Sequence, residues 1–180
     1  VLNAVNQSSS VKRVVLTSSI AAIYGNGKEA QSLPDNTYNE SHWNALSNLK
    51  NEPYKYSKTL AEKEAWKINE SQDNWTLYTI NPGFVLGPPL SNRTDSASMQ
   101  FGVDIVNGKF KAGIPNFTFS VVDVRDVARA HIKAAFTSSD PGRYIAVAET
   151  LSALDFMNTI GSHFGDRVPV PKRNISKILM

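Results

Sequence analysis

Short apolar runs alternate with helix-like segments along most of the 180 residues, and this alternation constrains the fold more than any other feature. The run Val14-Val15-Leu16 is rich in β-branched side chains and leads into small hydroxyl residues, which is typical of a buried parallel strand. Further strands are predicted over residues 75–80, 119–122 and 143–148, and helices over 57–68, 98–106, 123–132 and 152–164. Strands that alternate with helices indicate an α/β fold with a parallel sheet.

Composition excludes several classes of protein. A hydrophobic content of 41% and a charged content of 19% suit a folded globular domain. No apolar run approaches the roughly 20 residues that cross a bilayer, and Lys and Arg form no basic arm, so neither a membrane nor a nucleic acid is an expected partner. The chain has no cysteine, which removes disulfides and thiolate metal sites. We expect a cytoplasmic protein without a metal site.

The two ends of the sequence suggest a piece of a longer protein. Residues 1–5 have no initiator methionine and no helix-capping residue, and they resemble the tail of a helix. Residues 169–180 lead into no closing element. We therefore expect an internal fragment.

Two segments that follow predicted strands are candidates for ligand contact. Thr17, Ser18 and Ser19 end the first strand, and ligands of open α/β sheets bind at the carboxyl edge of the sheet. The same residues also suit a turn or a helix N-cap. The second segment is Asn81-Pro82-Gly83, where proline and glycine remove side-chain bulk and let a flat ligand approach the backbone. An ordinary turn is the alternative for this segment.

Tyr54 and Lys58 are four residues apart near the start of a predicted helix, so they would share one face. An ammonium beside a phenol favours the phenolate, and such a tyrosine can exchange a proton with a substrate oxygen. Tyr24 and Lys28 have the same spacing, but the two glycines between them disfavour a helix. Tyr54 and Lys58 are therefore the predicted catalytic pair.

These motifs, in this order, resemble those of the extended short-chain dehydrogenase/reductases, the NAD-dependent epimerase/dehydratase superfamily. The resemblance rests on Val14–Ser19, Tyr54 with Lys58, Asn81-Pro82-Gly83, Gly87-Pro88 and Val122–Ala128. Within that superfamily the chain is most similar to the dihydroflavonol reductase-like branch with its microbial, methylglyoxal-type carbonyl reductases. Glu40-Ser41-x-Trp43 and the turn from Lys63 to Trp66 match the branch as well.

The resemblance implies a Rossmann-like, doubly wound parallel sheet and a smaller substrate-binding domain. Residues 1–90 would be the second half of the Rossmann-like domain and carry the catalytic residues, and residues 91–180 would supply mostly substrate-domain and closing elements. The glycine-rich loop of the family is absent from this sequence, so this piece alone should bind cofactor poorly. NADP is implied by the branch, NAD stays possible, and a monomer or homodimer is expected.

When the roles of the family's motif residues are carried over position by position, the resemblance assigns catalysis to Ser19, Tyr54 and Lys58. Ser19, chosen over Ser18 for its spacing to Tyr54, would polarise the substrate carbonyl. Tyr54 would donate the proton, and Lys58 would favour the ionised tyrosine and bind the nicotinamide ribose. Substrate would contact Ser19, Tyr54 and Tyr24, and an aromatic residue at the last position disfavours a flavonoid. Besides Tyr54 and Lys58, the cofactor would contact Leu16, Thr17, Ser18, Pro82, Gly83, Phe84 and Val85.

The implied reaction is NAD(P)H-dependent reduction of an aldehyde or ketone to an alcohol, with the hydride coming from the nicotinamide. A nucleotide-sugar epimerase or dehydratase would use the same serine, tyrosine and lysine. In those enzymes a Tyr-Gly pair tends to lie one residue closer to the serine than the Tyr24-Gly25 pair does in this sequence. A non-catalytic NAD(P)-binding relative is the third alternative, and the intact set of Ser19, Tyr54 and Lys58 argues against it.

Overall fold

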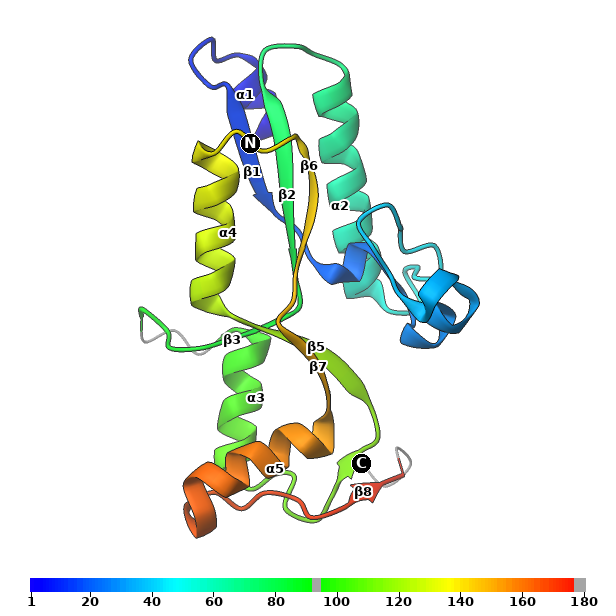
Figure 1. The fold of residues 1–180 in the computed structure, drawn as a ribbon, viewed down its shortest axis with the longest axis vertical. Helices are drawn as coiled ribbons and strands as arrows, with labels where there is room; N and C mark the ends of the chain where they lie inside the picture. Colours follow the sequence, from blue (N-terminus) through cyan, green and yellow to red (C-terminus); the bar gives the residue numbers. More distant parts are fainter. Residues whose placement is uncertain (92–94, 177–180) are drawn as a thin grey trace. The chain divides into compact units, whose positions relative to one another are not determined.

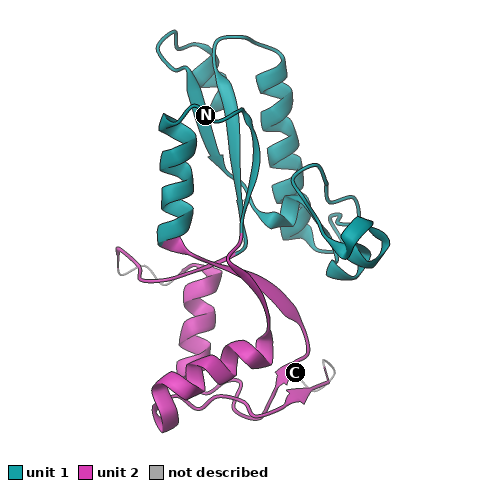
Figure 2. Ribbon diagram, in the orientation of Figure 1, with its two compact units in different colours: residues 1–83, 125–146 teal, residues 84–124, 147–180 magenta. Residues whose placement is uncertain are grey.

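The computed structural model describes residues 1–91 and 95–176, which form two compact units (Figures 1 and 2). Unit 1 comprises Val1–Gly83 and Arg125–Ala146. Unit 2 comprises the described residues of Phe84–Val124 and Val147–Met180. Each unit is thus assembled from two separate stretches of the sequence.

Unit 1 is built on a parallel sheet of three strands in the order β1-β2-β6 (Figure 1). The strands are β1 (Arg13–Thr17), β2 (Thr76–Pro82) and β6 (Gly142–Ala146). Thr17 lies opposite Ile80, and Pro82 lies opposite Ala146. Because the strands are parallel, their carboxyl ends meet at one edge of the sheet, and the residues predicted for ligand contact follow two of them.

Helices cover both faces of this sheet: α1 (Leu2–Asn6) and α2 (Pro53–Glu70) on one face, and α4 (Val124–Phe136) on the other (Figure 1). Leu77 of β2 packs with Ala65 of α2, whereas the next residue, Tyr78, packs with Ala134 of α4. Successive strand side chains point to opposite faces, so each helix layer buries one set of them. The predicted α/β class with a parallel sheet is confirmed.

Helix α2 is longer than the predicted 57–68 and begins at Pro53. The fixed φ of proline suits the first helical position, where its missing N–H is not needed. Tyr54 and Lys58 consequently both lie on the helix. Between β1 and α2 the chain forms only short 3-10 helices: η1 (Ile20–Ala22), η2 (Gly27–Ser32) and η3 (Pro34–Asn36).

Unit 2 contains a second sheet in the order β3-β5-β7, in which β3 runs parallel to β5 and β7 runs antiparallel to it. An apolar cluster that includes Ile105, Ile114 and Met157 forms its core. Ser152 accepts a hydrogen bond from the N–H of Asp155 at 3.0 Å and is the N-cap of the last α-helix. The elements are β3 (Phe84–Leu86), α3 (Ala97–Val106), β4 (Ile114–Pro115), β5 (Thr118–Asp123), β7 (Glu149–Ser152), α5 (Ala153–Phe164), η4 (Gly165–Arg167) and β8 (Asn174–Ile175).

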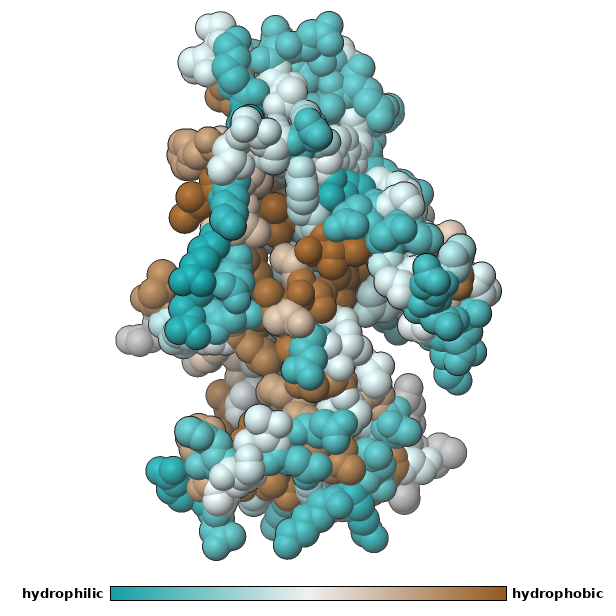
Figure 3. All heavy atoms as spheres, in the orientation of Figure 1, coloured by the Kyte–Doolittle hydropathy of each residue, from teal (hydrophilic) through white to brown (hydrophobic). Residues whose placement is uncertain are grey.

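Unit 1 includes a stretch that lies beyond residue 90. Residues 125–146 belong to unit 1, because β6 pairs with β2 and α4 packs on the same sheet. Figure 3 shows apolar side chains at the surface of the viewed face, among a mostly hydrophilic covering. Across the described ranges, no helix combines the length and the apolar character that a membrane crossing requires.

Candidate active site

The carboxyl edge of the sheet in unit 1 brings Ser19 next to the end of β2. The N–H of Ser18 donates to the carbonyl oxygen of Ile80 at 2.8 Å, so the pairing continues one residue beyond β1. The Asn81 amide then donates from Nδ2 to the carbonyl oxygen of Ser19 at 3.1 Å. Pro82 and Gly83 follow directly, and the Gly83 N–H donates to the carbonyl oxygen of Ala146 at 3.0 Å. The end of β1 and the end of β2 are thus joined by hydrogen bonds.

The two serines at the end of β1 have different environments. Ser18 is buried, and its hydroxyl donates to the Glu62 carboxylate. Ser19 is half-buried and caps η1, where its Oγ accepts a hydrogen bond from the Ala21 N–H at 3.1 Å. A serine hydroxyl has one donor and two acceptor positions, so this cap leaves the O–H of Ser19 able to donate to a ligand.

A polar face of α2 docks on the segment that follows β1. Lys58 donates from Nζ to the carbonyl oxygen of Thr17 at 3.3 Å, and Lys55 donates to that of Gly25 at 2.8 Å. Thr59 donates to the carbonyl oxygen of Ala21 at 3.4 Å. Residues 55, 58, 59 and 62 follow the three- and four-residue spacing of one helix face. This docking brings Lys58 to the strand end that carries Ser19.

Tyr54 lies one helical turn before Lys58, and its side chain is 65% exposed. The spacing of four residues puts both side chains on the same stripe of α2. The structure therefore ties Lys58 to Thr17, two residues before Ser19, and Tyr54 lies on the preceding turn of the same helix.

The other residues predicted to contact cofactor have diverse surroundings. Leu16 packs in the apolar cluster beneath α2, and Thr17 Oγ1 lies 2.7 Å from Nε2 of His131. Within unit 2, the Phe84 ring packs edge-on against Phe101 and Phe119. Val85, also in unit 2, lines a mainly apolar cavity of about 560 Å³ together with Leu86, Gly87, Ser98, Met99, Gly102, Val103, Val106 and Asn107.

Tyr24, the predicted substrate contact, stacks on Tyr38 with ring centroids 5.1 Å apart. The Tyr38 hydroxyl donates to the carbonyl oxygen of Asn26 at 3.1 Å and lies 3.3 Å from the Glu29 carboxylate. Burial, and after it the negative charge of Glu29, raises the pKa of Tyr38 above its ordinary value. Tyr38 therefore stays protonated at neutral pH and serves as an aromatic support for Tyr24.

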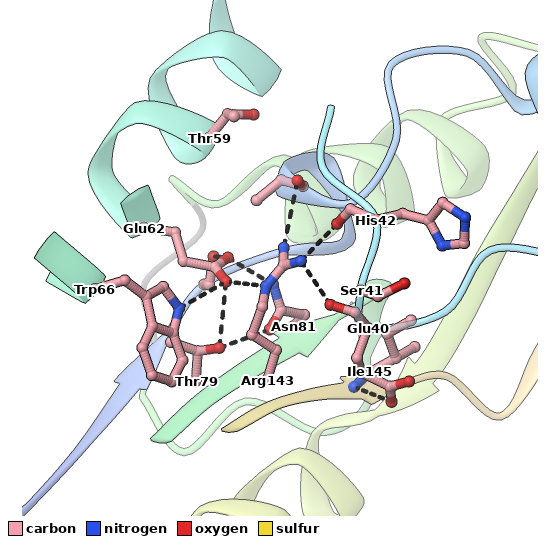
Figure 4. Close-up of polar contacts among 12 residues, drawn as sticks. Glu40, Ser41, His42, Thr59, Glu62, Trp66, Thr79, Asn81, Arg143 and Ile145 are labelled. Atoms are coloured by element: carbon pink, nitrogen blue, oxygen red, sulfur yellow. Dashed lines mark hydrogen bonds and ion pairs between the residues drawn. The ribbon is translucent and has the colours of Figure 1, made fainter. Parts of the chain in front are cut away.

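A buried ion pair joins Glu62 of α2 to Arg143 of β6, and the sequence analysis did not predict it (Figure 4). Glu62 of α2 is fully buried, and its Oε1 accepts from Nε of Arg143 at 2.6 Å. The second carboxylate oxygen accepts from Ser18 and, at 2.7 Å, from Nδ2 of Asn81. One signal in the sequence could have pointed to this group: Glu62 continues the four-residue spacing of Tyr54 and Lys58, so it lies on the stripe of α2 that carries both.

Arg143 also anchors the loop between η3 and α2. Its NH1 group donates to the carbonyl oxygens of Glu40 at 2.7 Å and His42 at 2.5 Å. The guanidinium carbon lies 3.6 Å from the ring centroid of Trp43, which is cation–π geometry. The predicted Glu40-Ser41-x-Trp43 motif thus serves to cover the buried charge of Arg143.

Comparison with known proteins places these features in context. Residues 1–151 match the 3-beta hydroxysteroid dehydrogenase/isomerase family. The chain is 40% identical over 153 residues to cinnamoyl-CoA reductase CAD2 of Medicago truncatula, with 82% of this chain and 44% of that protein covered. It is 33% identical over 180 residues to the NADPH-dependent methylglyoxal reductase GRE2 of Saccharomyces cerevisiae, with 92% and 51% covered.

A solved structure gives the same picture. The chain resembles the crystal structure of Gre2 in complex with NADPH from Candida albicans, with a TM-score of 0.72, 31% sequence identity, and 93% of this chain and 52% of that chain covered. The chain therefore spans about half the length of the relatives it matches.

Proposed function

This chain belongs to the 3-beta hydroxysteroid dehydrogenase/isomerase family of extended short-chain dehydrogenase/reductases, and on that basis we propose that the complete protein reduces an aldehyde or ketone to an alcohol with NADPH. The observation that carries the proposal is the hydrogen bond from Lys58 to the carbonyl oxygen of Thr17. It holds the helix with Tyr54 and Lys58 against the strand end that leads into Ser19. A relative named as an NADPH-dependent methylglyoxal reductase supports the reaction type and the cofactor.

Each of the three side chains has a role that its surroundings permit. Ser19 keeps its O–H available and would donate it to the substrate carbonyl oxygen, which polarises the carbonyl. Tyr54, exposed on the first turns of α2, would donate the proton that this oxygen needs as it becomes a hydroxyl. Lys58 would keep a positive charge beside the tyrosine and so ease loss of its proton.

The residues around this edge also suit a nicotinamide cofactor. Pro82 and Gly83 present little side-chain bulk at the end of β2, so a flat ring could lie close to their backbone. Lys58 has donors beyond its bond to Thr17 and would bind ribose hydroxyls. Leu16 would contribute through its backbone, since its side chain is packed in the core, and Thr17 and Ser18 would complete the contacts within unit 1. When bound, reduced nicotinamide supplies the hydride.

The substrate would approach Ser19 and Tyr54 from the side of Tyr24. Tyr24 is held by its stack on Tyr38, so an aromatic wall would favour a substrate with a small apolar group beside the carbonyl. Residues 1–90 would carry the catalytic residues, and most of residues 91–180 would shape the substrate side.

The proposal is tested by NADPH oxidation in the complete protein, followed at 340 nm, with the aldehydes methylglyoxal and isovaleraldehyde as probes and the thioester cinnamoyl-CoA as a separate probe. We expect oxidation of NADPH that depends on at least one of the two aldehydes, and oxidation with cinnamoyl-CoA alone would contradict the proposed reaction. Activity on a nucleotide sugar with none on carbonyl substrates would instead favour an epimerase or dehydratase. No turnover with any substrate, despite NADPH binding, would favour a non-catalytic relative.

A further inference from the structure

The carboxylate of Glu62 occupies a central position among the pieces of the proposed site. It is fully buried, and the two oxygens together accept five hydrogen bonds (Figure 4). The donors belong to different elements: Ser18 after β1, Thr79 and Asn81 in β2, Arg143 in β6, and Trp66 one turn further along α2. A buried ion pair is weak evidence for stability, because well-packed apolar residues often replace one without loss. We therefore consider which parts of the proposed site the ion pair holds in place.

Two of the proposed catalytic residues, Ser19 and Lys58, lie close to this carboxylate. Ser18, which donates to it, is the residue before Ser19. Asn81 donates from the same Nδ2 atom to Glu62 at 2.7 Å and to the carbonyl oxygen of Ser19 at 3.1 Å. Glu62 itself lies one helical turn after Lys58. The hydrogen bonds of Lys55, Lys58 and Thr59 tie this helix to the end of β1 and the segment after it, and Glu62 ties it to β2 as well.

Arg143 makes the arrangement rigid from the opposite side. It binds Oε1 with Nε and uses its other nitrogens on the carbonyl oxygens of the loop and of Ala22, so its position does not depend on Glu62 alone. The carboxylate is held between this fixed guanidinium and the two donors near Ser19. An ionised carboxylate only accepts hydrogen bonds, and every partner here is a donor.

We propose that Glu62, held by Arg143, is the positioning residue of the proposed reductase site and sets the distance between Ser19 and the Tyr54–Lys58 helix. The proposal rests on the proposed function for the identity of the site. A glutamine at this position has one acceptor oxygen and one NH₂ group. The glutamine oxygen can accept a hydrogen bond either from Arg143 or from Ser18 and Asn81. In both cases the NH₂ group of the glutamine then faces donors on the other side.

The test compares Glu62→Gln with a matched control in the complete protein. Arg13 is the control, because it also ties two elements together, with NH1 donating to the carbonyl oxygens of Ala134 at 2.7 Å and Thr137 at 2.6 Å. It does so from the start of β1, at the opposite end of the strand from Ser19. Both Glu62→Gln and Arg13→Met should lose stability, so kcat and KM are measured at a temperature at which both variants are folded by circular dichroism.

We expect Glu62→Gln to lower kcat about 10- to 100-fold, since misplacement of catalytic groups by about 1 Å has effects of this size. Arg13→Met should keep kcat within about threefold of wild type, because the bonds of Arg13 tie β1 to α4 at the end of the strand away from Ser19. Equal losses of kcat in the two variants would overturn the proposal, because they would point to general destabilisation.

Ser18→Ala serves as a second variant in case Glu62→Gln does not fold. It removes one donor from the carboxylate and leaves the ion pair intact, so a smaller fall in kcat, about three- to tenfold, is expected. The positioning role of Glu62 would be overturned if kcat is unchanged in Ser18→Ala and Glu62→Gln either keeps the wild-type kcat or does not fold. Failure of the proposed function is distinguishable, because wild-type protein would then show no carbonyl-dependent oxidation of NADPH.

Discussion

Replacement of Arg143 by methionine should destabilise the protein by about 3–5 kcal/mol, because it leaves the Glu62 carboxylate buried and uncompensated. Glu62 is fully buried and the Arg143 side chain is only 8% exposed, so water cannot take the place of the guanidinium. The variant also loses the contact of the guanidinium with the Trp43 ring, at 3.6 Å from its centroid. That contact adds about 1 kcal/mol, which places the expected loss in the upper part of the range.

The assay is a double-mutant cycle on the complete protein, with the free energy of unfolding measured in guanidinium chloride. Glu62→Gln and Arg143→Met are measured singly and together. The double variant has no uncompensated charge, so its loss should be smaller than the sum of the single losses by about 2 kcal/mol or more. This difference is the coupling energy of the pair.

Glu64 and Lys67 provide the control cycle on the same helix. Their charged atoms are 3.7 Å apart and both side chains are more than half exposed, so their coupling should stay within about 0.5 kcal/mol. A coupling between Glu62 and Arg143 no larger than that of the control pair would refute the reasoning. It would mean that solvent or neighbouring groups compensate the carboxylate as well as Arg143 does.

Three further predictions concern the site and unit 2. Lys58→Met should weaken NADPH binding to the complete protein about 10- to 100-fold by fluorescence titration, because a charged donor to the ribose is lost, and unchanged binding would contradict its role. Gly108→Ala should lower the free energy of unfolding by about 1–2 kcal/mol, because Gly108 follows α3 with a φ of +72° and an added Cβ would lie 2.8 Å from Pro169. An unchanged midpoint of unfolding in urea would contradict this. The pKa of Asp104 is lowered, first by its hydrogen bond from Lys109 and then by that from Gln100. The ionised Asp104 therefore stabilises the fold at pH values above the ordinary aspartate pKa, and this stabilisation is lost as the pH falls through the lowered pKa. In an NMR titration, Lys109→Met should raise the pKa of Asp104, and no change would rule out the bond.

The order of elements was predictable from the sequence because it depends on local pattern. The β-branched run before Thr17 and the helix formers after Pro53 each specify their element from neighbouring residues, and Ser152 supplies a cap within one turn of its helix. The boundaries of the units were not predictable in this way. Residues 125–146 return to unit 1 because β6 pairs with a strand more than 60 residues earlier, and no local pattern specifies such a pairing.

The buried ion pair shows the same limit at the site. Glu62 stands among Lys63, Glu64 and Lys67, so its neighbours in sequence suggest a solvated helix face. Its partner Arg143 is 81 residues away and joins it only when β6 completes the sheet. Tyr54 and Lys58 were found because their chemistry depends on a spacing within one helix. Glu62 was missed because its role depends on three strands.

The central claim is that Tyr54 supplies the proton in a carbonyl reduction, and Tyr54→Phe in the complete protein tests it most directly. The variant keeps the ring and removes only the hydroxyl, so NADPH binding measured by fluorescence should stay within about threefold of wild type. Loss of a general acid lowers turnover by about 10²–10⁴-fold, and kcat for reduction of the best carbonyl substrate should fall by that factor. A Tyr54→Phe protein that binds NADPH and reduces the substrate at the wild-type rate would contradict the claim.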